Sequence, residues 1–178
     1  MSNNKKKLAL SLAVLAVFVV FAFGSRVYGV DLTSQQLQDI ATNCSSSKNT
    51  LNRLHSSDAL LRVNMGQLYE SISTKLMEGF NGRVGGNNIN NSSLLAVYNN
   101  YNSDLDKFRT DYITYEKHLT AAMNIDCKSK PLEFFDAVKR ARNDRIKVHG
   151  DVESLNQSLD SYRLAISQVE AKVIGGGL

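Results

Sequence analysis

Apolar residues recur at alternating spacings of three and four along most of this chain, and this repeat is the feature that most constrains the fold. Such spacing places one apolar stripe on an α-helix, whereas a strand would need a period of two. The stripes are much longer than a typical globular helix, so they must pack lengthwise against one another. We therefore predict an all-α fold, an elongated antiparallel three-helix bundle that is coiled-coil-like and runs up, down and up.

Three stripes follow this pattern, and we expect their helices to span about 33–78, 93–126 and 131–174. Thr33 can cap the first helix, Gly79 ends it, and Pro131 suits the first turn of the third. The first stripe contains Leu37, Ile40, Cys44, Leu51, Leu54, Leu61, Met65, Leu68 and Ile72. The second contains Leu94, Tyr98, Tyr101, Leu105, Phe108, Tyr112, Tyr115, Leu119 and Ala122. The third contains Phe134, Val138, Ala141, Val148, Val152, Leu155, Leu159, Tyr162, Ile166, Val169 and Val173.

A segment rich in asparagine and glycine, FNGRVGGNNINNSS from Phe80 to Ser93, separates the first two stripes. Glycine and asparagine favour turns because they adopt backbone conformations that other residues avoid. The segment is therefore predicted to be the turn of a helical hairpin.

The only two cysteines, Cys44 and Cys127, lie at equal distances along the chain from Gly85 and Gly86 in this turn. An antiparallel hairpin would bring them to the same level. An even cysteine count in an exported protein favours a disulfide, so we predict that these two residues are bonded. Two independently buried thiols are the alternative.

Asp58 and Arg145 are the charged residues that interrupt the first and third stripes. The positions of the two predicted turns place them at the same level of the bundle, with residue 113 of the second helix between them. We predict that they form an ion pair, buried inside the bundle or at its edge, that fixes the register of the helices more than it adds stability. In the alternative, both charges face solvent and the stripe is locally rotated.

The N-terminus carries Lys5, Lys6 and Lys7 before an uncharged and almost wholly apolar run, Leu8 to Phe23. This order is typical of an export signal, in which the positive charge stays in the cytoplasm. Residues 1–30 are predicted to be a signal peptide or a signal-anchor transmembrane segment. If the segment is not cleaved, residues 8–25 would anchor the chain in the membrane. Residues 31–178 would then lie outside the cytoplasmic membrane, secreted or in the cell envelope.

The net charge of +4 comes from this N-terminal region. Lys5, Lys6, Lys7 and Arg26 are four of 21 basic residues, which leaves 17 after Asp31 against 17 acidic residues. The predicted bundle is therefore neutral, and the charge gives no reason to expect nucleic acid as a partner.

No catalytic, cofactor-binding or metal-binding motif is recognisable in the sequence. His55 and His118 are expected within about a turn of each other, but two histidines are too few ligands for a metal site. The aromatic residues of the second stripe are interpreted as core. We expect a non-enzymatic protein without cofactors.

Leu37 and Ile40 precede Cys44 and would project past the second helix, so they are candidates for a surface of self-association. Local packing against the turn before Pro131 is the alternative. The leading functional hypothesis is an envelope-associated scaffold, spacer or adaptor that acts on a protein partner. A helical bundle that senses a small molecule outside the cytoplasm is the alternative.

Overall fold

The computed structural model describes residues 32–175 of the 178-residue chain. The chain divides into two units, residues 1–33 and residues 34–178, and the described helices lie in the second unit. The predicted export segment lies outside the described residues. In the part of the chain that the structure describes, no helix combines the length and the apolar character needed to cross a membrane.

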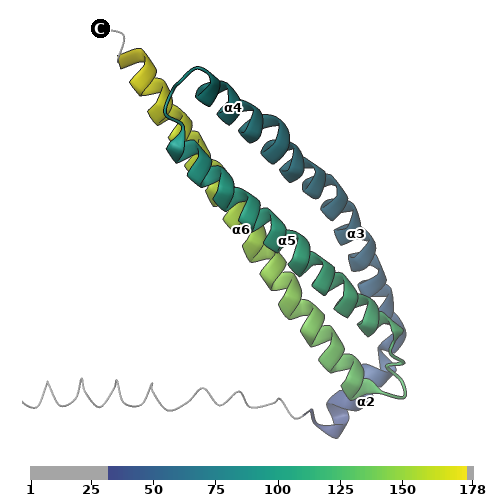
Figure 1. The fold of residues 1–178 in the computed structure, drawn as a ribbon. Helices are drawn as coiled ribbons and strands as arrows, with labels where there is room; N and C mark the ends of the chain where they lie inside the picture. Colours follow the sequence, from purple (N-terminus) through teal and green to yellow (C-terminus); the bar gives the residue numbers. More distant parts are fainter. Residues whose placement is uncertain (1–31, 176–178) are drawn as a thin grey trace, which may run out of the picture. The chain divides into compact units, whose positions relative to one another are not determined.

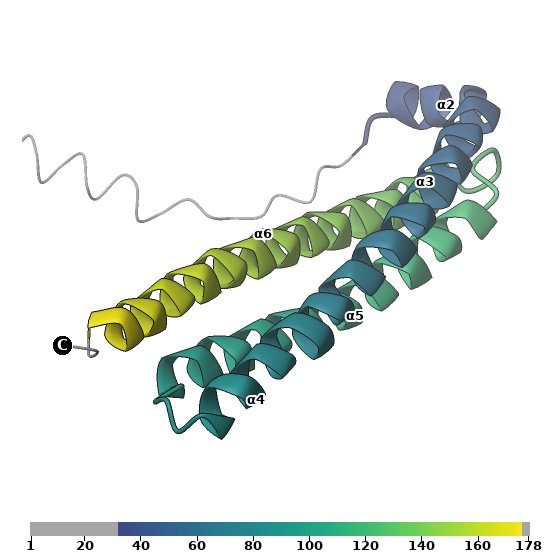
Figure 2. The same ribbon diagram turned by 90° about the horizontal axis from the view of Figure 1, so that it is seen from above.

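The described residues form helices connected by short segments, without a strand, which confirms the predicted all-α class. The first part of the chain forms α2 (Ser34–Thr42), α3 (Cys44–Ser71), the π-helix η1 (Ile72–Met77) and α4 (Glu78–Gly86). Two long helices follow, α5 (Ser92–Asn124) and α6 (Pro131–Gly175). Figures 1 and 2 show that the chain reverses between α4 and α5 and again between α5 and α6, so that α5 and α6 lie antiparallel along each other.

The first helical run extends further than predicted, because it continues past Gly79 to Gly86. Packing overrides the low helix propensity of glycine here. Asn81 is buried, and its side-chain oxygen accepts a hydrogen bond of 2.7 Å from the Tyr162 hydroxyl of α6. The turn is confined to the residues between α4 and α5, where Asn88 takes a left-handed conformation with φ of 57°.

The same run is also interrupted twice, so the expected single helix over 33–78 is wrong in detail. It breaks at Asn43, between α2 and α3, and α2 turns to pack against α6 (Figure 1). It widens again in η1, where the π-helix adds a residue to the turn and changes which side chains face α5. Ser73 and Met77 of η1 are buried as a result.

The core lies along α5, the central helix. Every residue of the second predicted stripe is buried except Tyr98, which is half-buried. The third stripe is likewise buried or half-buried on α6, apart from Val173 near its end. This agreement follows from position, since α5 packs against both α6 and α3.

The first stripe is only partly buried, because α3 stands off from α6. No Cα atom of α3 lies within 8 Å of a Cα atom of α6, and Figure 1 shows α3 bowed away from α6. Leu61 remains 57% exposed and Leu68 49% exposed, whereas Tyr69, which the pattern missed, is 2% exposed. The large Tyr69 ring occupies the space between the helices and packs edge-on against Phe108, at 5.7 Å between centroids.

Candidate functional site

One end of the bundle is fastened by a disulfide between Cys44 and Cys127, with 5.4 Å between their Cα atoms. The predicted pairing is therefore present in the structure. Cys44 begins α3, and Cys127 lies in the turn between α5 and α6, so the bond ties the first helical run to the other two helices. Both residues are buried in a cluster with Phe134.

The two residues proposed as a surface of self-association lie beside this disulfide. Ile40 is half-buried and packs against the cluster of Cys44, Cys127 and Phe134, which corresponds to the alternative of local packing. Leu37 is also half-buried. A role of Leu37 in self-association stays a prediction.

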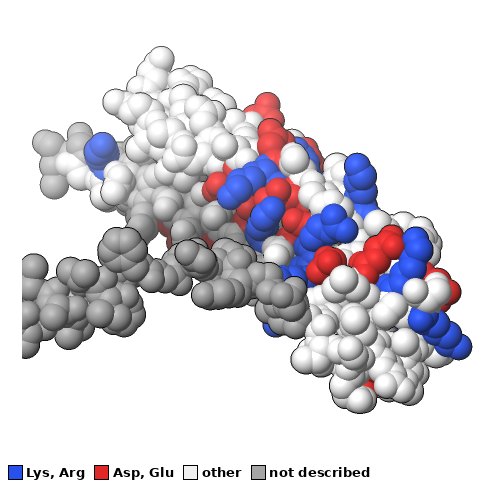
Figure 3. All heavy atoms as spheres, turned by 90° about the horizontal axis from the view of Figure 1, so that it is seen from below, with Lys and Arg blue, Asp and Glu red and all other residues white. Residues whose placement is uncertain are grey.

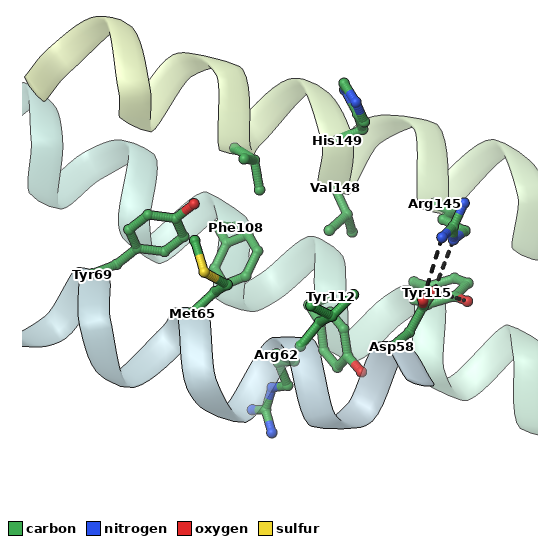
Figure 4. Close-up of a pocket in the computed structure, with 12 residues that line it drawn as sticks. Asp58, Arg62, Met65, Tyr69, Phe108, Tyr112, Tyr115, Arg145, Val148 and His149 are labelled. Atoms are coloured by element: carbon green, nitrogen blue, oxygen red, sulfur yellow. Dashed lines mark hydrogen bonds and ion pairs between the residues drawn. The ribbon is translucent and has the colours of Figure 1, made fainter. Parts of the chain in front are cut away.

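Asp58 of α3 and Arg145 of α6 lie together beside a pocket (Figure 4). The Arg145 Nε atom donates to Asp58 Oδ2 at 2.8 Å, and Nη2 donates to Oδ1 at 3.3 Å. Asp58 is buried and Arg145 is half-exposed, so the pair lies at the edge of the packed region. The backbones of α3 and α6 do not approach each other closely. The ion pair still joins the two helices, because the long arginine side chain spans the distance between them.

The sequence pattern missed a third member of this group, Tyr115 of α5, whose hydroxyl donates to Asp58 Oδ2 at 2.8 Å. Burial raises the pKa of Asp58, but the hydrogen bonds from Arg145 and Tyr115 and the positive charge of Arg145 outweigh it. The net result is a pKa below the ordinary value for an aspartate. Asp58 of α3 is thus held ionised by one group from α5 and one from α6.

A cavity of about 250 Å³ opens beside this ion pair, between α3, α5 and α6. It exists because α3 stands off from α6 at this level. Figure 4 shows side chains from the three helices around it, with the ion pair at one end and Tyr69 at the other. The lining residues are Asp58, Leu61, Arg62, Met65, Tyr69, Phe108, Tyr112, Tyr115, Arg145, Val148, His149 and Val152.

The Tyr69 side chain lines the cavity, and its hydroxyl is buried without a hydrogen-bond partner. Burial raises its pKa above the ordinary value for tyrosine, so the group stays protonated near neutral pH. A buried polar group without a partner is costly, and native proteins contain few of them. Tyr69 is therefore the unusual feature of this cavity.

Other charged and polar side chains in the interior pair with a neighbouring helix. His55 Nε2 lies 3.0 Å from Glu116, and His118 Nδ1 lies 2.6 Å from Asp144. The two histidines predicted to approach each other thus bind different carboxylates. In the part of the chain described, no cluster of three or more His, Cys, Asp and Glu residues is arranged to hold a metal ion.

Asp151 of α6 is the most unfavourably placed of the interior carboxylates. Its Oδ1 atom accepts from Lys107 at 3.1 Å, but its Oδ2 atom is buried without a hydrogen-bond partner. Burial, together with the nearby carboxylate of Asp111, outweighs the effect of Lys107 and raises the pKa of Asp151. No signal in the apolar pattern marked this residue, because it stands next to a stripe position rather than in it.

Basic and acidic side chains are intermixed on the face of the molecule shown in Figure 3. The basic run from Lys139 to Lys147 contains Asp144, which pairs with Lys147 and His118. Neither the face shown nor this basic run therefore presents a continuous field of one sign that would attract a polyanion.

No protein-family model, no curated protein and no solved structure matches the chain.

Proposed function

We propose that this chain is a non-enzymatic, exported or membrane-anchored helical protein that serves as a scaffold, spacer or adaptor at the cell envelope. On this proposal, residues 31–178 lie outside the cytoplasmic membrane. They form an elongated, coiled-coil-like, antiparallel three-helix bundle that runs up, down and up after the export segment of residues 1–30.

The observation that carries the adaptor role is an exposed apolar groove between α3 and α5. It is lined by Ala59, Arg62, Val63, Tyr112, Ile113 and Glu116. Val63 is 49% exposed and Ile113 is 60% exposed, and Leu60 lies exposed one turn before Val63. Contiguous exposed aliphatic residues favour an interaction site, and a groove between two helices suits the apolar face of a third.

The partner that fits this groove is a helix of another protein with an apolar face and polar flanks. Arg62 and Glu116 stand at the groove with opposite charges, so they can pair with a partner that carries both signs. Arg62 is held in place because its guanidinium lies 5.0 Å from the centre of the Tyr112 ring. The groove thus has an apolar centre and charged edges, which is the usual anatomy of an interface.

The spacer role is supported by the length and fastening of the helices. α6 contains 45 residues, which corresponds to about 67 Å at 1.5 Å per residue. The disulfide and the ion pair between Asp58 and Arg145 both join the first helical run to the rest of the unit. Such cross-links favour a stiff body over independently moving helices.

Site-specific photo-crosslinking in the cells that produce the protein tests the adaptor role. A photoreactive amino acid at position 63 or 113 should give one discrete adduct of higher mass. The matched control is position 164, because Leu164 is an aliphatic residue on α6 that is even more exposed than Val63 and Ile113. Equal yields at all three positions, or no adduct at 63 and 113, would reject the groove as a partner site.

Intact mass spectrometry of the exported protein tests the rest of the proposal. A chain beginning near Ser25 or Val30 would show a cleaved signal peptide, and a full-length chain recovered with the membrane would show an anchor. A full-length chain that stays in the cytoplasm would reject export altogether.

A second candidate function, the sensing of a small molecule, is favoured by the cavity beside Asp58 and Arg145. Ligands that bind only the folded state raise its melting temperature. A panel of small molecules of varied charge and size should therefore contain compounds that stabilise the purified protein. A panel without any such compound would leave the scaffold proposal alone.

A further inference from the structure

The cavity between α3, α5 and α6 has a size that limits what it can hold. Its volume is about 250 Å³, whereas an apolar protein cavity of about 150 Å³ is known to hold benzene. A molecule of one or two fused rings therefore fits, and a long acyl chain or a nucleotide does not. Leu61 lines the cavity and is half-exposed, so the cavity is open to solvent and a ligand can enter beside it.

The walls of the cavity are apolar and largely aromatic. Phe108 and Tyr112 of α5 line it, with 6.3 Å between their ring centroids, and Val148 and Val152 of α6 face them. Aromatic rings attract other aromatic rings in edge-to-face and offset arrangements. Met65 adds a flexible thioether that adapts to the shape of a ligand.

The charged side chains at the cavity are either paired or directed away from it. Asp58 and Arg145 pair with each other, and His149 pairs with Glu153 at 3.4 Å and points away from the cavity in Figure 4. The guanidinium of Arg62 also lies on the side of α3 turned away from α6 (Figure 4). An ionic ligand would lose its hydration without gaining an opposite charge, so the cavity favours a neutral molecule.

Tyr69 supplies the polar contact that would orient such a ligand. Its hydroxyl is buried without a partner and is directed from α3 toward α6 (Figure 4). A ligand hydroxyl or carbonyl that reaches it, once the side chains covering the hydroxyl shift, would satisfy the group, which can both donate and accept a hydrogen bond. The cost of the unpaired hydroxyl in the free protein would then be recovered on binding.

We propose that this cavity binds a neutral aromatic molecule of one or two fused rings carrying a single hydroxyl or carbonyl group, with Tyr69 as its hydrogen-bond partner. The proposal rests on the second candidate function and goes beyond it by naming the class of ligand. The groove between α3 and α5 is a separate hollow, although Arg62 and Tyr112 line both.

Three probes that share one ring system test the proposal on the purified exported protein. They are 2-naphthol, naphthalene, which lacks the polar group, and 2-naphthoate, which is charged. Binding is measured by titration calorimetry and by the fluorescence of the naphthyl group. We expect 2-naphthol to bind at one site per chain, about fivefold or more tightly than naphthalene, as one hydrogen bond provides. We expect 2-naphthoate to bind more weakly than 2-naphthol.

Two variants separate the hydrogen bond from the space. Tyr69→Phe keeps the ring and removes the hydroxyl, so 2-naphthol should fall to the affinity of naphthalene while naphthalene itself is unaffected. Val152→Phe fills the cavity and should abolish the binding of both. Ile113→Phe adds similar bulk in the groove between α3 and α5, and it should leave both affinities unchanged.

The outcomes distinguish this proposal from the function on which it rests. Equal affinities for 2-naphthol and naphthalene, or a preference that survives Tyr69→Phe, overturn the proposed ligand class. If none of the probes binds but the panel of small molecules yields stabilising compounds of another class, sensing stands and this inference falls. If neither the three probes nor any compound of the panel binds, both the sensing function and this inference fall. The crosslinking result still decides the adaptor role. Should Val152→Phe fail to fold, as its circular dichroism would show, the Tyr69→Phe comparison alone decides.

Discussion

Reduction of the disulfide between Cys44 and Cys127 should destabilise the protein strongly, because the bond closes most of the hairpin. The two residues are 83 positions apart. In the chain-entropy model, a loop of this length restricts the unfolded chain by about 4 to 5 kcal/mol of free energy at 25 °C. This value is a ceiling, because a compact unfolded state is already restricted. For a domain of this size, such a loss corresponds to a fall in melting temperature of roughly 10 to 18 °C.

The measurement is thermal unfolding of the exported protein, followed by circular dichroism, with and without a reductant. Alkylation and intact mass must show that both thiols are free in the reduced sample. The control is the double variant Cys44→Ala, Cys127→Ala, whose melting temperature should not respond to the reductant. A fall of less than about 3 °C after complete reduction would refute the reasoning, since the unfolded chain would then gain little freedom.

Three further predictions concern single side chains. The variants Asp58→Arg and Arg145→Asp should each lower the free energy of unfolding by about 1 to 2 kcal/mol, a modest value because the arginine is half-exposed to solvent. In a double-mutant cycle, the variant that carries both changes should recover much of this loss. The raised pKa of Asp151 means that its protonated form stabilises the fold and that this contribution is lost as pH rises through the folded-state pKa. Asp151→Asn should therefore raise the melting temperature at pH 7 by about 2 °C, and this gain should shrink toward pH 4. The absence of any gain at pH 7 would mean that the Asp151 carboxylate is well solvated. Ile40→Asp should lower the melting temperature more than Leu37→Asp, because Ile40 packs on the cluster of Cys44, Cys127 and Phe134. A monomeric mass for the unaltered protein in solution would reject the role of Leu37 and Ile40 in self-association.

The parts of the site that the sequence anticipated depend on distance along the chain. Cys44 and Cys127 lie together, as do Asp58 and Arg145, because residues equally far from a turn meet in antiparallel helices. Small errors in the length of the turn matter little, since a displacement of one or two residues changes the level by only about 1.5 to 3 Å. A long side chain such as arginine absorbs that difference.

The cavity could not be anticipated, because it depends on which side chains separate the helices. Leu61 and Leu68 fit the three and four spacing better than Tyr69, yet Tyr69 is the buried residue. Its ring occupies the space beside Phe108, and α3 lies too far from α6 to enclose the leucines. Spacing reveals which face of a helix is apolar, but it carries no information on how closely that face approaches its neighbours.

The sequence by itself determined the helical class, the apolar stripe of α5 and the levels at which residues meet. These features follow from the helical period and from the positions of turns, and both are local properties of the chain. Only the tertiary structure decided the break at Asn43, the π-helix from Ile72 to Met77 and the continuation of the helix to Gly86. Each of these features fits the first helical run to neighbours that are distant in the sequence. At the end near Asn43 the neighbours are the disulfide and α6, and at the other end Tyr162 bonds to Met77 and Asn81. Packing of large side chains against those neighbours outweighs the propensities of single residues, and it leaves the buried Tyr69 hydroxyl beside the cavity.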